Sequence, residues 1–457
     1  MTRGLDAARA CLHKKKSELM RKLLPKKLRN RCHRLSANIQ LSAFTLLAFA
    51  TLTLSHGQQV LIAPPVVPSE PPPTDSTSDT NQIDLAGGGS PVSASSASAN
   101  RNPFQWGPVI LHPRLGYGFS SGTGLQSAPG QSRKSVVNTL SPGIGFDLGR
   151  HWQINYTAGA AFYSDPNFKD SVNHNLTLSG RTTYGDWGFN LAQGVAISSD
   201  PLVETAQQTA QQTYSTTLAT SYQINSVLSS VLTLGQELRD LQGVPNSAGS
   251  SSDWSLSGAL NYQLGPGVST GLGAGFGYNK VEVGPDMTHE DLNLQFGYQL
   301  ARQLSLSLNG GLQIRQFLNS GQSALVSPTF GASLNYRPFD YTTLSLAASR
   351  SISPSYFQNQ VTEGTSVTLG LSQRFFKHYY FSVNGGYDVT TYQDSTLVGA
   401  QFHGREDSRS FFGVSLSTSF LKHGTVSVSY SKNQNSSNAL GYGFNSDQFG
   451  LSLAYGY

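Results

Sequence analysis

Cysteine, charge and long apolar runs are all scarce in this 457-residue chain. Its two cysteines, Cys11 and Cys32, lie near the N-terminus, which excludes a disulfide framework or a thiolate metal site in the remainder. Charged residues make up only 12%, about half the share of an ordinary soluble domain. The apolar run at 41–54 is too short to span a bilayer comfortably as a helix. A chain of this length with so little charge favours one large closed sheet over several soluble domains.

The net charge of +5 combines two regions of opposite character. Residues 1–57 hold 12 of the 31 basic residues but only two acidic ones, Asp6 and Glu18, so the remaining chain carries 19 basic against 24 acidic residues. If residues 1–57 are removed, the remaining chain is no longer net basic. Nucleic acid is therefore not an expected partner.

The first 105 residues predict export followed by a flexible leader. Basic clusters precede the apolar run 41–54, and the small residues Ser55 and Gly57 follow it, which is the pattern of a signal peptide over 1–57. An N-terminal membrane anchor is the alternative. Residues 58–105 are rich in Pro, Ser and Gly and cannot bury a core, so we expect a disordered periplasmic leader. Docking of its Pro-rich part to a partner is the alternative to a simple spacer.

From residue 106 to the end, polar and apolar residues alternate with period two, as in strands with one polar and one apolar face. In 152–162 one parity reads Trp, Ile, Tyr, Ala, Ala, Phe, while the other reads Gln, Asn, Thr, Gly, Ala. The segments 291–300 and 304–315 alternate in the same way. Each run has about ten to thirteen residues, a length that suits a tilted strand crossing a bilayer.

Short and long connections alternate through this region. Tight turns are predicted at 148–152, 184–188, 223–227, 264–268, 300–304, 337–341, 376–380 and 421–425, and longer polar loops include 120–135, 198–212, 239–253, 390–410 and 432–448. This alternation predicts an all-β, antiparallel up-and-down transmembrane barrel of about eighteen strands over 106–457, with both ends on the short-turn side. A soluble β-sandwich or solenoid is the alternative. Aromatic residues near segment ends are typical of interfacial girdles and favour the barrel: Trp152, Trp187, Tyr341, Phe376, Tyr379, Tyr380 and Tyr457.

Three segments, 140–165, 199–225 and 336–376, resemble the β-barrel porin (type 2) family in texture and strand order. That family includes outer-membrane proteins associated with exosortase or exopolysaccharide systems. The resemblance covers about 107–457 and implies a location in the outer membrane of a Gram-negative envelope and, more weakly, a role linked to exopolysaccharide export. The family has no catalytic signature that could be carried over to residues of this chain.

The sequence contains no recognisable catalytic or metal-binding motif. The seven histidines after the signal form no HExxH motif or ligand spacing: His112, His151, His174, His289, His378, His403 and His423. No GxSxG elbow is present, and the Gly-rich stretch 271–279 lies within an alternating strand, so its glycines are better explained as one bare face than as a phosphate loop. We therefore expect no enzyme activity, no cofactor and no metal. An outer-membrane hydrolase acting on lipid or glycan is the least favoured alternative.

The polar parity should face the lumen. It is rich in Ser, Thr, Asn, Gln and Gly, and its charges of both signs nearly cancel; the candidate lumen-lining residues are Arg114, Asp147, Arg181, Glu237, Asp291, Arg315, Arg374 and Asp388. Such a lining predicts a porin-like conduit for hydrophilic solutes without strong ion selectivity. A closed structural or binding barrel in the envelope is the alternative. Expected partners are outer-membrane lipids, the barrel-assembly machinery, and polysaccharide or small hydrophilic solutes.

The last segment, 446–457, predicts a closing strand. Its apolar parity should face lipid, and its backbone should pair with the strand around 109–119. An alternating terminal strand that ends on an aromatic residue also resembles the signal by which outer-membrane barrels are recognised for insertion, so the candidate assembly signal is Phe449, Leu451, Leu453, Tyr455 and Tyr457.

Overall fold

The computed structural model describes residues 104–242, 250–282, 285–300, 303–355, 360–376, 378–394 and 404–457. The predicted signal peptide, 1–57, and all but the last two residues of the predicted leader, 58–105, lie outside this range. None of the described residues forms a helix with the length and hydropathy needed to cross a bilayer.

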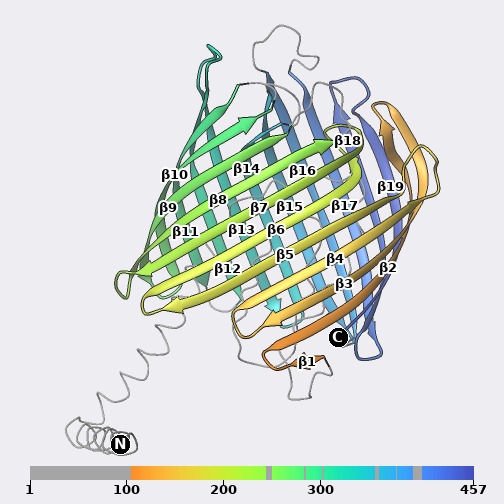
Figure 1. Cartoon of the computed structure of the whole chain (residues 1–457), viewed down its shortest axis with the longest axis horizontal. Helices are drawn as coiled ribbons and strands as arrows, with labels where there is room; N and C mark the ends of the chain where they lie inside the picture. Colours follow the sequence, from red (N-terminus) through yellow and green to blue (C-terminus); the bar gives the residue numbers. More distant parts are fainter. Residues whose placement is uncertain are drawn as a thin grey trace, which may run out of the picture. The chain divides into compact units, whose positions relative to one another are not determined.

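The described chain is a single antiparallel sheet that closes into a barrel (Figure 1). Its strands are β1 (Gln105–Trp106), β2 (Val109–Ala128), β3 (Gln131–Leu148), β4 (Trp152–Tyr163), β5 (Ser171–Tyr184), β6 (Trp187–Leu202), β7 (Gln207–Gln223), β8 (Leu228–Gln242), β9 (Ser251–Gly265), β10 (Val268–Val281), β11 (Met287–Leu300), β12 (Leu304–Phe317), β13 (Leu325–Phe339), β14 (Thr342–Pro354), β15 (Gln360–Phe375), β16 (Tyr379–Asp394), β17 (Glu406–Phe420), β18 (Gly424–Ser437) and β19 (Phe444–Gly456). Each strand from β2 to β19 pairs with its neighbours in chain order, which gives the 18-strand up-and-down barrel that the sequence predicts.

The barrel closes where the last strand meets the first long one. β19 pairs with β2 from Gln448 opposite Gly122 to Gly456 opposite Arg114, and the Tyr457 amide donates to the Pro113 carbonyl at 3.0 Å. This confirms the predicted closing pair. It also satisfies the backbone groups that an open sheet edge would leave unpaired in hydrocarbon.

The outer face of the barrel is apolar. Leu292 and Leu294 on β11, for example, are 57% and 63% exposed, and their strand neighbours of opposite parity point inward. Six of the seven predicted girdle aromatics are exposed near strand ends at the short-turn side, while Tyr380 lies on the inner parity. A closed barrel with such an outer face is the form in which strands cross an outer membrane, and the protein is an outer-membrane barrel.

The connections at the long-loop end are shorter than the sequence predicts. The six predicted tight turns whose residues are all described are confirmed, and the other two, 300–304 and 376–380, include residues outside the described ranges. Strand pairing, however, continues through much of the predicted loops. In the predicted loop 120–135, β2 extends to Ala128 and β3 begins at Gln131. Likewise β6 and β7 leave only residues 203–206 between them in the predicted loop 198–212. Ser, Thr and Gln residues suit paired strands that extend into solvent as well as a loop, so composition could not distinguish the two.

One glycine at this end has a backbone conformation that would strain any other residue. Gly124 has φ +79°, and a Cβ built on it would lie 2.1 Å from the Asn445 carbonyl oxygen across the β2–β19 seam. Gly124→Ala should therefore destabilise the barrel by at least about 1–2 kcal/mol, the cost of left-handed backbone for a non-glycine residue. The measurement is the urea midpoint of the folded protein in detergent.

The matched control for that change is Gly116→Ala on the same strand. Gly116 has no positive φ, and its added Cβ would be 3.5 Å from Ser141 Cβ, an ordinary contact. Equal urea midpoints for the two variants would contradict the prediction.

Candidate functional site

The inner wall of the barrel is built from the polar parity of its strands. Side chains such as Ser255 and Ser257 on β9 alternate with the exposed Trp254 and Leu256, and they keep partial solvent exposure inside the barrel. All eight candidate lumen-lining residues lie on this inner parity of their strands: Arg114, Asp147, Arg181, Glu237, Asp291, Arg315, Arg374 and Asp388. Their role in solute passage stays a prediction.

Several charged side chains of the inner wall have polar, aromatic or oppositely charged partners nearby. Arg114 donates to the Thr157 hydroxyl at 2.8 Å, and the Arg374 guanidinium lies 4.0 Å from the centre of the Tyr341 ring. Opposite charges meet in the pairs Asp388–Arg409 at 2.7 Å and Glu237–Arg239, and the His112 ring lies 2.8 Å from the Asp147 carboxylate. Compensation of this kind leaves the wall hydrophilic without a field of one sign.

A second cluster of polar side chains on the inner wall includes the buried Arg315. Arg315 is only 2% exposed, and His289 Nε2 lies 3.7 Å from Asp291 Oδ2. Asp291 also accepts a hydrogen bond from Gln313 Nε2 at 2.7 Å. These side chains pack beside the bare inner strip of β10, where a Cβ added to Gly277 would lie 2.0 Å from the His289 ring. The glycines of 271–277 thus make room for neighbouring side chains, and Arg315 offers little surface to a solute.

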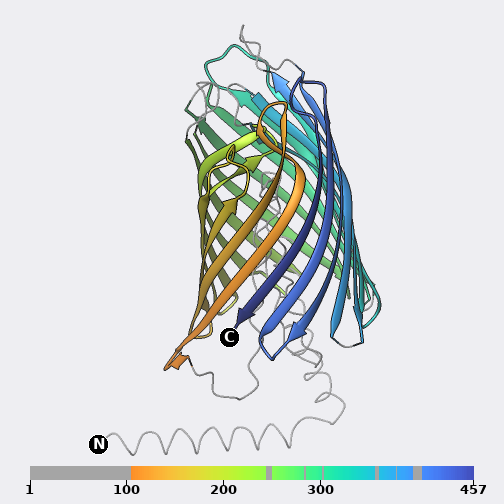
Figure 2. The same ribbon diagram turned by 90° about the vertical axis from the view of Figure 1, so that its right-hand side faces the viewer.

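The end of the β6–β7 hairpin folds inward across the outer mouth (Figure 2). Three strands separate β2 from β6 in the sheet, yet β2 contacts both β6 and β7. Leu202 and Ala206 at this hairpin end are fully buried, and Val203 packs against Phe444 of β19. Strands so far apart in the sheet can touch only if a hairpin leaves the wall and crosses the opening.

The β14–β15 hairpin also leans over the lumen. Ile352 of β14 and Val361 of β15 pack against Met287 of β11, although β12 and β13 lie between these strands in the sheet. Glu363 of the same hairpin pairs with Arg350 and accepts a hydrogen bond from the Ser327 hydroxyl at 2.6 Å. Two hairpins therefore narrow the outer end of the barrel.

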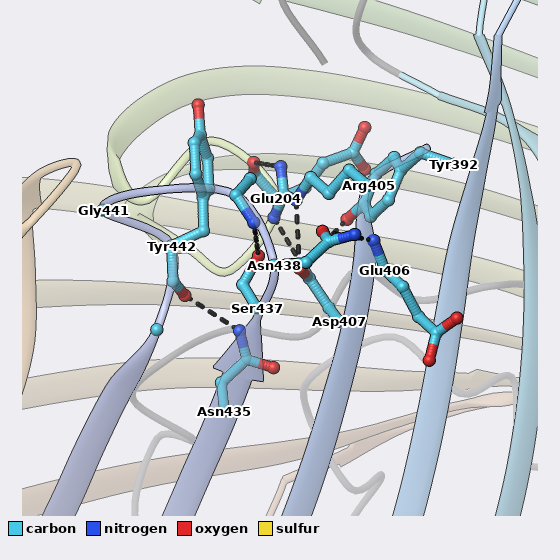
Figure 3. Close-up of polar contacts among 12 residues, drawn as sticks. Glu204, Tyr392, Arg405, Glu406, Asp407, Asn435, Ser437, Asn438, Gly441 and Tyr442 are labelled. Carbon is cyan, nitrogen blue, oxygen red and sulfur yellow. Dashed lines mark hydrogen bonds and ion pairs between the residues drawn. The ribbon is translucent and has the colours of Figure 1, made fainter. Parts of the chain in front are cut away.

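Arg405 ties the inward hairpins to the wall (Figure 3). Its guanidinium pairs with Asp407, with Nε 3.1 Å from Oδ1, and Nη1 donates to the Glu204 carbonyl at 3.0 Å in the β6–β7 turn. The guanidinium carbon lies 4.3 Å from the centre of the Tyr392 ring and 3.8 Å from that of Tyr442. We call Glu204, Tyr392, Arg405, Asp407 and Tyr442 the mouth clasp.

Four of the five clasp residues are buried and Glu204 is half-buried. With Ser355, the clasp links the β6–β7, β14–β15, β16–β17 and β18–β19 connections. Arg405 is 1% exposed, and the Ser355 hydroxyl, from the β14–β15 connection, donates to Glu204 Oε1 at 2.6 Å. Burial alone would lower the pKa of Arg405, but the hydrogen bond and charge of Asp407, with Tyr392 and Glu204, outweigh it and raise the pKa. The guanidinium therefore stays charged and holds its partners in place.

The sequence did not single out the clasp residues. Glu204, Arg405, Asp407 and Tyr442 all fall within predicted polar loops, where a charge or a tyrosine is ordinarily solvated. A usable signal was the presence of tyrosines in loops that are otherwise made of small polar residues. Among the described residues no group of His, Cys, Asp and Glu is placed to hold a metal ion.

No family model matches the chain, and no curated protein matches its sequence. Solved structures with some likeness include the outer membrane protein OpdK of Pseudomonas aeruginosa, with 12% identity, 76% of this chain and 98% of that chain covered, and a TM-score of 0.42. OccK2 (OpdF) of the same organism gives 12%, 76%, 98% and 0.43, and OccAB4 of Acinetobacter baumannii gives 11%, 78%, 100% and 0.42. The closed sheet itself establishes an outer-membrane barrel, whereas the resemblance to the type 2 porin family and its exosortase and exopolysaccharide association stay predictions.

Proposed function

We propose that the protein is an outer-membrane channel for small hydrophilic solutes, with weak charge selectivity and an outer mouth narrowed by the β6–β7 and β14–β15 hairpins. The observation that carries the proposal is the inner wall, where partly exposed Ser, Thr, Asn and Gln side chains accompany charges of both signs, including the pairs Glu237–Arg239 and Asp388–Arg409. A barrel of 18 strands is wide enough for a water-filled lumen unless the chain fills it. Hydroxyl and amide groups suit neutral solutes and water alike.

Purified protein inserted into planar bilayers should give discrete conductance steps. In a potassium chloride gradient the reversal potential should lie near zero, because the paired charges of the wall favour neither ion. Empty bilayers and heat-denatured protein are the controls. Folded barrels that insert without any current would contradict an open channel.

A closed structural or binding barrel is the second candidate, and the mouth clasp favours it. The clasp buries Arg405 and fixes two hairpins over the opening, as a permanent lid would require. The same bilayer recording separates the candidates, because a permanent lid predicts silent insertion and a channel predicts steps.

The narrower role in exopolysaccharide export rests on the family resemblance. Its support from the residues is the neutral hydroxyl and amide lining, which suits sugar hydroxyls but is not specific for them. A polymer would need the clasp to open, so polymer entry should depend on Arg405. Contacts with outer-membrane lipids and the barrel-assembly machinery belong to the same proposal, supported by the apolar outer face and by the alternating last strand.

The hydrolase alternative gains no support from the best-placed histidine. His112 Nε2 contacts Asp147 at 2.8 Å, and Nδ1 lies 3.1 Å from the Tyr457 carbonyl oxygen. Both ring nitrogens lie against oxygen acceptors, and among the described residues no serine hydroxyl is hydrogen-bonded to this ring. We propose passage rather than catalysis.

A further inference from the structure

Three polar side chains form a row across the outer face of β6, β7 and β8. Gln193 pairs with Thr216 in the β6–β7 register, and Thr216 pairs with Gln236 in the β7–β8 register. Thr216 Oγ1 lies 3.0 Å from Gln193 Oε1 and 3.4 Å from Gln236 Oε1. We call these three residues the amide row.

The amide row faces outward, toward lipid. It shares its parity with exposed apolar residues of the same strands: Trp187 and Phe189 on β6, Tyr214 and Leu218 on β7, and Leu232 and Leu234 on β8. Val195 on one side of Gln193 and Leu191 on the other continue the apolar face along β6. The row is therefore flanked by apolar residues of the same parity on all three strands.

The height of the row places it within the hydrocarbon layer. Gln193 follows the girdle residue Trp187 by six positions on β6, which is about 20 Å along the strand. At the usual tilt this is roughly 15 Å above the girdle, well inside an apolar band of about 25 Å. Interfacial headgroups are too far away for a glutamine side chain to reach.

The row cannot satisfy its own hydrogen-bonding groups. Thr216 has one hydroxyl proton, so it can donate fully to only one of the two carboxamides. Among the described residues neither Gln193 Nε2 nor Gln236 Nε2 has a hydrogen-bond partner. Lipid tails offer no acceptor, and unpaired amide groups are costly in hydrocarbon.

We infer that the outer face of β6–β8 is the contact surface for a second copy of this chain, joined by hydrogen bonds between the two amide rows. A carboxamide carries both donors and an acceptor, so the row is complementary to itself when two copies meet about a two-fold axis. The row has no charge, so two copies do not repel. Polar side chains facing each other between membrane segments are a known source of association. This inference goes beyond the proposed channel and does not depend on it.

Cysteine cross-linking in outer-membrane vesicles tests the contact. Cys11 and Cys32 are first changed to serine, and Leu218→Cys then introduces a single thiol beside the row. The matched control is Leu346→Cys on β14, whose leucine is exposed to a similar extent, 43% against 38%. Copper phenanthroline should give a disulfide-linked dimer at least several-fold more abundant for Leu218→Cys. Equal yields from the two positions, or a cross-link from Leu218→Cys to a different protein, would overturn the inference.

A second variant ties the contact to the row itself. Gln193→Leu with Gln236→Leu, in the Leu218→Cys background, should weaken dimerisation by about tenfold. This is the effect expected from losing hydrogen bonds between polar side chains of two membrane segments. Heat-modifiable migration on gels verifies that the variant is folded, and leucine on a lipid-facing position is compatible with the barrel. Undiminished cross-linking in folded barrels would show that the row does not join the copies.

Discussion

Replacing Arg405 by alanine should widen the outer mouth, which the two hairpins narrow in the wild-type channel. The change leaves Asp407 buried and unpaired, frees the Glu204 carbonyl, and removes the group between the Tyr392 and Tyr442 rings. Removing one partner of a buried ion pair costs about 3–5 kcal/mol. Opening the hairpins rehydrates Asp407, so the open state gains by a factor of roughly 10² or more.

Single-channel conductance and current block by small dextrans added to the outer side measure this effect. We expect larger or longer openings and easier polymer entry for Arg405→Ala than for the wild-type protein. Arg405→Lys should be intermediate, because an ammonium keeps the charge but cannot form the planar paired contacts and ring stacking.

The matched control for the clasp is Arg409→Ala. Arg409 lies on β17, four residues after Arg405. It pairs with Asp388 at 2.7 and 3.0 Å and lies 5.0 Å from the Phe411 ring centre. Its partner is on the neighbouring strand β16, so breaking this pair releases no hairpin. Identical conductance and dextran block in Arg405→Ala and wild type would refute the gating role of the clasp.

Changing Tyr457 to aspartate should sharply reduce the amount of assembled barrel. The Tyr457 ring lies 4.6 Å from the His423 ring and 5.6 Å from the Phe104 ring, and its amide joins β19 to Pro113. Loss of a ring contact costs about 0.5–1.5 kcal/mol, and a carboxylate at the bilayer edge adds up to about 1 kcal/mol. Together these correspond to roughly a tenfold loss in the ratio of folded to unassembled protein.

Heat-modifiable migration and surface yield measure this loss. Leu440→Asp is the control, because Leu440 is fully exposed in the connection between β18 and β19. Tyr457→Phe should assemble normally, since the ring and the backbone pairing remain. Normal yield of Tyr457→Asp would argue against a role for the last residue in assembly.

The architecture was largely predictable from the sequence, because strand parity is a local property. Leu292, Leu294 and Phe296 on one parity, against Asp291, Asn293 and Gln295 on the other, define two faces without reference to the rest of the chain. The tight turns were equally local, and the six whose residues are all described are confirmed. The ends of the strands were less predictable, since polar residues such as those of 120–135 serve either a solvated ladder or a loop.

The inner wall was only partly predictable. Parity assigns Asp388 to the lumen but does not reveal that register places it opposite Arg409, which neutralises both. Arg315 was expected to line the lumen in the same way as the other charges, yet neighbouring side chains bury it. Register and packing depend on partners from other strands, which alternation alone cannot specify.

By itself, the sequence determined that the chain forms a closed sheet with a polar inside, an apolar outside and a terminal strand that completes it. Only the tertiary structure decided that two hairpins cross the outer mouth and that Arg405 holds them through Glu204, Asp407, Tyr392 and Tyr442. The difference is physical: alternation is set by the environment on each side of a strand, whereas the clasp joins residues up to about two hundred positions apart whose meeting depends on how hairpins bend across the lumen.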